Sequence, residues 1–271
     1  MERRITVSAI QMPVVAGDVR ANIARAGRLL EEAARRRSGI ALLPEMWNTG
    51  FAYGELDRLA KEAWEPTLDL LRDFATGAGM SVFGSIPEFR DGGVYNALVH
   101  VAPGGQITGT YRKIHLFPLT GEHLHFRAGR GLTLFETAAG PVGGLICYDL
   151  RFPEPARILA TAGARMLLYA AQWPAARQRH WETLLAARAV ENQCWVVAAN
   201  TVGSWKGLTY AGGSRIIDPW GVVQDAAEGE EAVVTVTVSL EEADRIRAEL
   251  PSLSDRRPDA YRLEDRPDHE G

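Results

Sequence analysis

The chain has 271 residues, 46% of them apolar, and a formal net charge of −4 with acidic and basic residues mixed along most of its length. This length and apolar content suffice for a sizeable core. The mixed charges form no basic stripe, so an electrostatic nucleic-acid footprint is excluded. No apolar run approaches the roughly 18 residues that a membrane-spanning helix needs, and the N-terminus lacks the apolar segment of a signal peptide. We therefore expect a cytoplasmic protein with no nucleic-acid or membrane partner.

Hydrophobic periodicity predicts strands and helices that alternate along the chain. The expected strands cover residues 5–12, 40–43, 81–86, 95–101, 107–113, 142–147, 166–171, 194–200, 212–217 and 233–239. The expected helices run from a cap at Asp18 to residue 37, and over residues 68–78, 155–162, 175–191 and 241–250. Because no repeat or linker divides this pattern, it predicts one α/β domain over residues 1–250, with hairpins that make the sheet mixed. Residues 251–271 are expected to form a polar C-terminal tail.

Cysteine and lysine are scarce enough to be informative. The two cysteines, Cys147 and Cys194, cannot form a disulfide framework and neither lies in a Cys-x-x-Cys pattern, so they act as single thiols. Among 30 basic residues the only lysines are Lys61, Lys113 and Lys206. An ammonium is a compact charge with an adjustable pKa, whereas guanidinium is planar and permanently charged. A lysine kept in this arginine-rich chain therefore raises the question of a chemical role.

Glu45 follows a buried apolar run and Pro44, at the carboxyl end of a predicted strand. Ligands bind at this edge in α/β proteins. A carboxylate there is costly to desolvate unless it is paired or used as a base. Taken alone, however, a surface glutamate in a turn after a proline is the simpler interpretation.

Lys113 interrupts an apolar segment, Tyr111–Phe117. An ammonium beside a reacting carbonyl stabilises developing oxyanion charge. The alternative is a solvated strand residue whose apolar neighbours face inward. Arg112 fits that alternative better, because alternation along a strand places it on the opposite face from Lys113.

Cys147 ends a strand that contains two glycines and precedes a turn with polar residues. A thiol at a strand-to-helix junction resembles a nucleophile elbow, in which the following backbone N–H serves as an oxyanion donor. The alternative is a small buried apolar residue. That alternative is the better interpretation of Cys194, which lies in a continuous apolar strand.

Three segments together resemble the glutamate, lysine and cysteine motifs of the carbon–nitrogen hydrolase superfamily. They are Leu43–Glu45, Tyr111–Leu116 and Cys147–Glu154, and the resemblance extends in order over about residues 4 to 240. It implies a carbon–nitrogen hydrolase domain with a four-layer αββα sandwich of mixed sheets. It also implies a small-molecule amide substrate, no cofactor, and a homodimer or higher homo-oligomer formed through the helical layers.

The resemblance also implies a role for each matching residue. Glu45 would take the proton of Cys147 and later protonate the departing ammonia. Lys113 and the backbone N–H of Tyr148 would hold the oxyanion, and a thioester on Cys147 would be hydrolysed by water. A second glutamate usually follows the lysine, and Glu122 is the candidate. Its surroundings are less standard, and its alternative is a loop carboxylate.

The residues after the cysteine favour an amide over a nitrile, because nitrilases usually have Cys-Trp-Glu where this chain has Cys147–Asp149. The segment Cys147–Glu154 is similar to the omega-amidase branch, which acts on terminal amides of small 2-oxo dicarboxylic acids. The stretch from Gln172 to Asn192 is similar to the same branch. An N-carbamoyl or deaminated-glutathione amidohydrolase of the superfamily is the alternative.

Three residues are candidates for substrate binding. Arg151 would clamp a distant carboxylate with two parallel hydrogen bonds; alternatively it pairs with Asp149 or Glu154. Phe117 and Trp173 would line the pocket, although aromatic residues at such positions more often pack in the core.

Functions of other classes fit less well. His115, His123 and His125 cluster in sequence, but no His-Glu-x-x-His motif supports a metallohydrolase, so no metal site is expected. A papain-like hydrolase using His115 or His180 lacks the expected signature around the cysteine. A non-catalytic binding protein that retains the fold is the remaining alternative.

Overall fold

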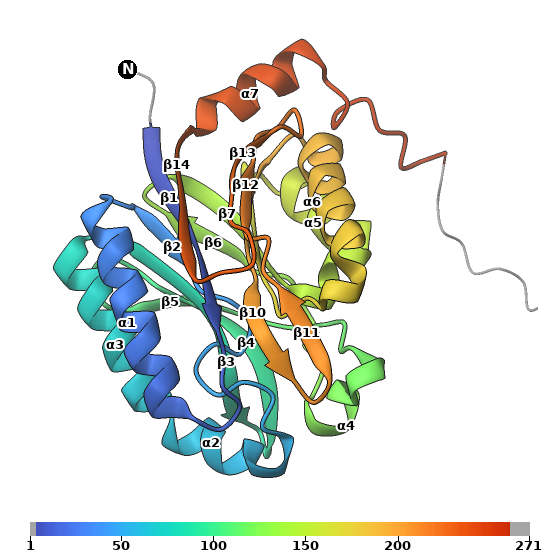
Figure 1. Ribbon diagram of the computed structural model, residues 1–271. Helices are drawn as coiled ribbons and strands as arrows, with labels where there is room; N and C mark the ends of the chain where they lie inside the picture. Colours follow the sequence, from blue (N-terminus) through green and yellow to red (C-terminus); the bar gives the residue numbers. More distant parts are fainter. Residues whose placement is uncertain (1–3, 261–271) are drawn as a thin grey trace, which may run out of the picture.

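Two β-sheets lie face to face at the centre of the structure, and helices cover the outer face of each (Figure 1). The computed structural model describes residues 4–260. Helices α1 (Val19–Arg35) and α3 (Trp64–Ala78) pack on the larger sheet, while α5 (Pro153–Thr161) and α6 (Gln178–Asn192) pack on the smaller one. The α/β class and the four-layer αββα sandwich with mixed sheets are thereby confirmed.

The larger sheet has eight strands in the order β11-β10-β1-β2-β3-β4-β5, with β14 paired to β1. Pairing is parallel where β1 meets β2 and β10 and where β2 meets β3, and antiparallel elsewhere. The continuous apolar run of β2 suits a strand that is covered on both faces. The strands are β1 (Arg4–Pro13), β2 (Ile40–Leu42), β3 (Ser81–Arg90), β4 (Gly93–Val101), β5 (Ile107–Arg112), β10 (Thr201–Trp205), β11 (Leu208–Ala211) and β14 (Ala232–Ser239).

The smaller sheet has six strands in the order β13-β12-β9-β8-β7-β6. Strands β7, β8 and β9 are parallel, and the other pairings are antiparallel. Gly144 of β7 lies where the sheets meet: a Cβ there would come within 2.6 Å of Leu98 and Phe135, so the close packing requires glycine. The strands are β6 (Leu134–Thr137), β7 (Gly140–Ile146), β8 (Met166–Ala170), β9 (Trp195–Ala199), β12 (Arg215–Ile217) and β13 (Val223–Ala226).

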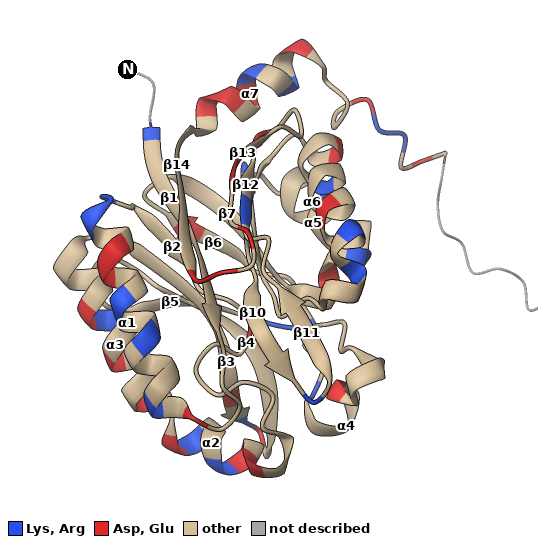
Figure 2. Cartoon of the chain, in the orientation of Figure 1, with Lys and Arg blue, Asp and Glu red and all other residues tan. Residues whose placement is uncertain are grey.

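Shorter helices complete the described chain: α2 (Leu56–Glu62), α4 (Glu122–His125) and α7 (Leu240–Glu249). The predicted cap of α1 is present, because the Asp18 side chain accepts a hydrogen bond of 3.0 Å from the backbone N–H of Ala21. Acidic and basic residues are intermixed along the outer helices (Figure 2). Within residues 4–260 no helix has both the length and the apolar character needed to cross a membrane.

The structure corrects several predicted elements. Helix α3 begins at Trp64 instead of residue 68, and β3 extends to Arg90 instead of residue 86. Strands β9 to β12 occupy the region in which two strands were expected, and α2, β6 and β13 were not predicted. Three of these strands, β6, β11 and β13, are four-residue strands at sheet edges with at most one buried residue each, so they have little apolar pattern. Of the predicted tail, residues 251–260 form mostly exposed turns after α7, and residues 261–271 lie outside the described residues.

His100 of β4 is a buried titratable group in the core between the sheets. Its ring stacks on that of Phe83 with 4.2 Å between centroids, and its Nδ1 lies 2.7 Å from the hydroxyl of Thr108. Burial lowers the pKa of His100 to about 4, from an ordinary value of 6.5. The neutral ring is therefore favoured in the folded protein and the charged ring in the unfolded chain.

We expect this difference to destabilise the fold in acid. The contribution of His100 is fully present above pH 6.5 and is lost as the pH falls toward 4, by at most about 3 kcal/mol. Urea unfolding at several pH values should therefore show a flatter profile across this window for His100→Gln. Parallel profiles of the two proteins would show that His100 does not carry the effect.

Candidate active site

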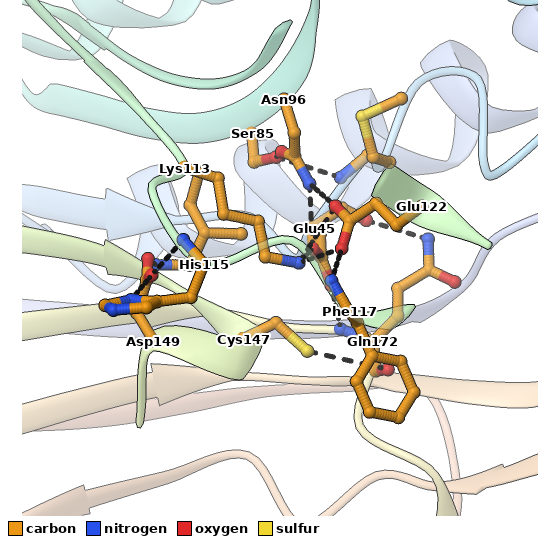
Figure 3. Close-up of polar contacts among 12 residues, drawn as sticks. Glu45, Ser85, Asn96, Lys113, His115, Phe117, Glu122, Cys147, Asp149 and Gln172 are labelled. Carbon is orange, nitrogen blue, oxygen red and sulfur yellow. Dashed lines mark hydrogen bonds and ion pairs between the residues drawn. The ribbon is translucent and has the colours of Figure 1, made fainter. Parts of the chain in front are cut away.

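Glu45, Lys113 and Cys147 follow the carboxyl ends of three strands, β2, β5 and β7. All three are buried: Glu45 and Lys113 are 1% exposed, and Cys147 is 8% exposed. Glu45 and Lys113 come from the larger sheet and Cys147 from the smaller one, so the site forms where the two sheets face each other. The fold thus brings together three residues that are far apart in the sequence (Figure 3).

Lys113 lies between two carboxylates. Its Nζ donates to Oε1 of Glu45 at 2.8 Å and to Oε1 and Oε2 of Glu122 at 2.9 and 2.7 Å. Glu122, the first residue of α4, is as buried as Lys113. The structure therefore places Glu122 in the same cluster as Glu45 and not in an exposed loop.

Two amide side chains hold Glu45 in place. The Nδ2 group of Asn96, on β4, donates to Oε1 of Glu45 at 2.8 Å and to Oε1 of Glu122 at 3.1 Å. The backbone N–H of Gln172 donates to Oε2 of Glu45 at 3.0 Å, and the Gln172 side chain donates to the Glu45 carbonyl oxygen at 2.8 Å. Both carboxylate oxygens of Glu45 are thus fixed in direction.

Burial and charge set the protonation states of this cluster. Burial lowers the pKa of Lys113, but the carboxylates of Glu122 and Glu45 outweigh it and hold that pKa well above its usual value. Lys113 is therefore charged. Burial raises the pKa of Glu122, against the opposing effect of Lys113.

Cys147 begins a short 3-10 helix, Cys147–Arg151, directly after β7. Its φ of 43° lies in the left-handed region, which side chains with a Cβ rarely adopt, so the strand-to-helix turn is strained as in a nucleophile elbow. The Sγ atom lies 3.8 Å from the Gln172 carbonyl oxygen. Tyr148 follows in the first turn, where backbone N–H groups have no acceptor within the helix.

Burial, and then the charge of Glu45, raise the pKa of the Cys147 thiol well above its usual value, while Lys113 acts in the opposite direction. The resting cysteine is therefore a protonated thiol. Because only the thiolate is a strong nucleophile, a base must remove the proton as the sulfur attacks.

Asp149 anchors the turn that carries Cys147. Its Oδ2 accepts hydrogen bonds from the backbone N–H of Ile146 at 2.9 Å and from the hydroxyl of Tyr111 at 2.7 Å. Its Oδ1 accepts from the backbone N–H of His115 at 3.2 Å and lies 2.8 Å from Nδ1 of that ring. A single buried carboxylate thus ties the cysteine turn to the segment around Lys113.

Two cavities meet at Cys147. One is lined in part by Glu45, Lys113 and Glu122. The other is lined by Tyr148, Arg151, Trp173 and Arg177 in addition to residues that both cavities share. The shared residues are Phe117, Cys147, Gln172 and Pro174. A molecule bound at Cys147 can therefore extend in two directions of different polarity.

Arg151, Trp173 and Phe117 all line the second cavity. The Arg151 guanidinium lies over the Trp173 ring at 4.8 Å from its centroid. Among residues 4–260 it forms no ion pair with Asp149 or Glu154; Asp149 is occupied by Tyr111 and His115. One guanidinium nitrogen of Arg151 lies 3.4 Å from Nδ1 of His180, so the remaining N–H groups are the ones available to a ligand.

Three histidines that the sequence offered as alternatives make contacts outside the cluster of Glu45, Lys113 and Glu122. The His115 ring stacks on Phe152 at 3.7 Å between centroids and contacts Asp149, and His125 stacks on Tyr53 at 4.2 Å. His180 lies 3.4 Å from the Arg151 guanidinium. Within the described residues no three His, Cys, Asp or Glu side chains are grouped to hold a metal ion.

Sequence reasoning missed four residues that shape the site: Asn96, Asp149, Gln172 and Arg177. Asn96 had a detectable signal, because an amide in the otherwise apolar core of β4 requires a buried polar partner. The other three lie in segments that resemble those of the family, but their contacts depend on which strands become neighbours.

Comparison with known proteins identifies the family. A model of the carbon–nitrogen hydrolase family matches residues 6–248, and the chain belongs to this family. The 2-oxoglutaramate amidase of Bacillus subtilis is 39% identical over 257 residues, which cover 94% of this chain and 99% of that relative. The omega-amidase YafV of Yersinia enterocolitica is 36% identical over 253 residues, covering 93% and 96% of the two chains.

Solved structures include a carbon–nitrogen hydrolase superfamily protein of Xanthomonas campestris with an arsenic adduct in its active site. It has a TM-score of 0.87 and 35% sequence identity, and the comparison covers 94% of this chain and 98% of that one. The likeness therefore extends over both sheets and the helices outside them.

Proposed function

We propose that this protein is an amidase that hydrolyses a small carboxylate-bearing amide through a thioester on Cys147. The observation that carries the proposal is the buried cluster in which Lys113 is held between Glu45 and Glu122 beside a cysteine on a strained turn. An arrangement of base, cation and thiol is suited to acyl transfer.

Acylation begins when Sγ of Cys147 attacks the amide carbonyl carbon. Because the resting thiol is protonated, Glu45 takes its proton in the same step. The oxyanion that forms is stabilised by the ammonium of Lys113 and the backbone N–H of Tyr148. When the tetrahedral intermediate collapses, the carbon–nitrogen bond breaks and Glu45 returns the proton to the leaving group, which departs as ammonia.

Deacylation repeats the sequence with water. Glu45 takes a proton from a water molecule, whose oxygen attacks the thioester carbonyl carbon. Collapse then breaks the carbon–sulfur bond and releases the carboxylic acid, and the departing sulfur takes back the proton from Glu45, which restores the thiol and the carboxylate. Asn96 and Gln172 keep the Glu45 oxygens in one orientation through both halves of the cycle.

Glu122 has a different role from Glu45 in this scheme. When Glu45 is protonated, the Lys113 ammonium would lose its negative partner if Glu45 were alone. Glu122 contacts the same ammonium through both oxygens, so Lys113 stays paired and oriented while Glu45 changes charge. Glu122 is thus a positioning residue.

The substrate preference rests on Arg151 and on the relatives. A guanidinium in the cavity next to Cys147, with no carboxylate partner among the described residues, suits a substrate whose carboxylate lies away from its amide. The relatives named above as 2-oxoglutaramate amidase and omega-amidase support monoamides of 2-oxo dicarboxylic acids as that substrate.

We further propose that the protein is a cytoplasmic homodimer or higher homo-oligomer, and that its carbon–nitrogen hydrolase domain ends at residue 250. Ile158 of α5 and Val190 of α6 are more than half exposed, at 55% and 51%. Apolar side chains on these outer helices would be covered in a homodimer formed through the helical layers.

A panel of substrates tests the proposed function. Released ammonia is measured with 2-oxoglutaramate, 2-oxosuccinamate, glutamine, a neutral aliphatic amide and an aliphatic nitrile. We expect the 2-oxo acid amides to give the highest kcat/KM and the nitrile to give none. A higher kcat/KM for the nitrile, or no ammonia from any amide, would contradict the proposal.

A further inference from the structure

The cavity that contains Arg151 contains a second guanidinium, that of Arg177. Arg177 ends a short 3-10 helix, Ala175–Arg177, which leads into α6. Its carbonyl oxygen accepts a hydrogen bond of 2.9 Å from Nε1 of Trp173. The backbone of Arg177 is therefore fixed to the same buried tryptophan on which Arg151 stacks.

The Arg177 guanidinium lies over the ring of Phe117, 5.9 Å from its centroid. A cation on an aromatic face keeps its N–H groups free at the edge. Among residues 4–260 Arg177 forms no ion pair, and none of the described residues that line this cavity is acidic. Two cations thus share one small cavity without a negative charge to balance them.

We propose that Arg177 is a second cationic arm for the distal end of the substrate and a specificity-determining residue of the amidase. This inference rests on the proposed function and deepens it. One guanidinium binds the carboxylate, and the other donates to a second oxygen on the neighbouring carbon. A 2-oxo acid has both acceptors side by side.

The same pair selects against the 2-amino analogue. Glutamine places an ammonium where the 2-oxo acid has a carbonyl oxygen, so a positive group would lie beside two guanidinium groups in a cavity with no acidic side chain in its lining. Like charges in a partly desolvated cavity repel, and the ammonium loses hydration without gaining an acceptor. Arg177 therefore distinguishes a 2-oxo acid amide from an amino acid amide of the same length.

Arg177→Gln tests the arm, with Arg179→Gln as a matched control that removes an exposed arginine outside the cavity. We expect Arg177→Gln to lower kcat/KM for 2-oxoglutaramate about 10- to 100-fold, as for the loss of a hydrogen bond to a charged group. In Arg177→Gln, kcat/KM for a neutral amide should change less than about threefold. In Arg179→Gln, kcat/KM should change less than about threefold for both substrates. The preference for 2-oxoglutaramate over glutamine should narrow in Arg177→Gln alone.

A second measurement does not depend on turnover. Alkylation of Cys147 by iodoacetamide is followed by mass spectrometry with increasing 2-oxoglutarate or glutamate as protecting ligand. We expect 2-oxoglutarate to protect better than glutamate, and Arg177→Gln to raise the half-protecting concentration of 2-oxoglutarate about 10- to 100-fold.

The two measurements separate the possible failures. Protection that weakens in Arg177→Gln, without ammonia from any amide in the parent protein, would overturn the proposed function and leave the cationic arm standing. If the parent protein hydrolyses amides, but Arg177→Gln keeps the same protection by 2-oxoglutarate and the same preference for 2-oxoglutaramate over glutamine, the role of Arg177 alone would be overturned. An equal loss of kcat/KM for neutral and charged amides in Arg177→Gln would also overturn the proposed role of Arg177.

Discussion

Cys147→Ala is expected to lower kcat/KM for amide hydrolysis by about 10⁴- to 10⁶-fold, the loss typical of removing a nucleophile that acts as part of a unit. The variant should fold normally, because alanine changes neither the left-handed backbone at this position nor the hydrogen bonds of Asp149 that hold the turn. Ammonia release and circular dichroism measure the two effects.

Cys194→Ala is the matched control, because Cys194 is the other thiol of the chain. It is fully buried directly before β9, its Sγ lies 3.2 Å from the Ala164 carbonyl oxygen, and Arg247 contacts it at 3.0 Å. Burial raises the pKa of Cys194 to about 11, even though Arg247 opposes the shift. We expect this variant to retain most of its activity. Similar activity in the two alanine variants would remove Cys147 from the mechanism.

Lys113→Met is expected to have the largest effect on stability. It leaves the buried carboxylates of Glu45 and Glu122 without the cation that both contact, and breaking such a buried pair costs about 3–5 kcal/mol. It also removes an oxyanion donor, which should lower kcat by at least about 100-fold. Urea unfolding at neutral pH and ammonia release measure the two losses.

The pH dependence identifies the cause of the instability. Without the cation, burial and the charge of Glu45 raise the folded-state pKa of Glu122 further, so the stability deficit should be largest above neutral pH and shrink as the pH falls toward 5. Lys61→Met removes an exposed lysine of α2 and should leave stability and activity nearly unchanged. A deficit in Lys113→Met that does not vary with pH would mean that lost packing, and not charge, causes it.

The positions of Glu45 and Cys147 were predictable because each follows a strand with a buried apolar run. The runs before Glu45 and Cys147 are buried on both faces, so their periodicity and boundaries are visible in the sequence. The opposite faces of Arg112 and Lys113 also followed from alternation: Arg112 pairs with Glu88 near the surface, whereas Lys113 is buried.

The remaining features depend on tertiary neighbours. Asn96 reaches Glu45 only because β4 pairs with β3 and its register brings the amide to this point. The two arginines share a cavity because segments that begin at the ends of β7 and β8 fold back over Cys147. The edge strands β6, β11 and β13 have little burial pattern of their own, so periodicity could not indicate them.

The central claim is that the acyl group is carried by Cys147. The direct measurement is to mix the protein with 2-oxoglutaramate, quench in acid within one turnover, and locate any adduct by intact-protein and peptide mass spectrometry. We predict a mass gain equal to the substrate less ammonia, located on the peptide that contains Cys147 and absent from Cys147→Ala. An adduct on Cys194, or turnover without any covalent adduct, would contradict the account.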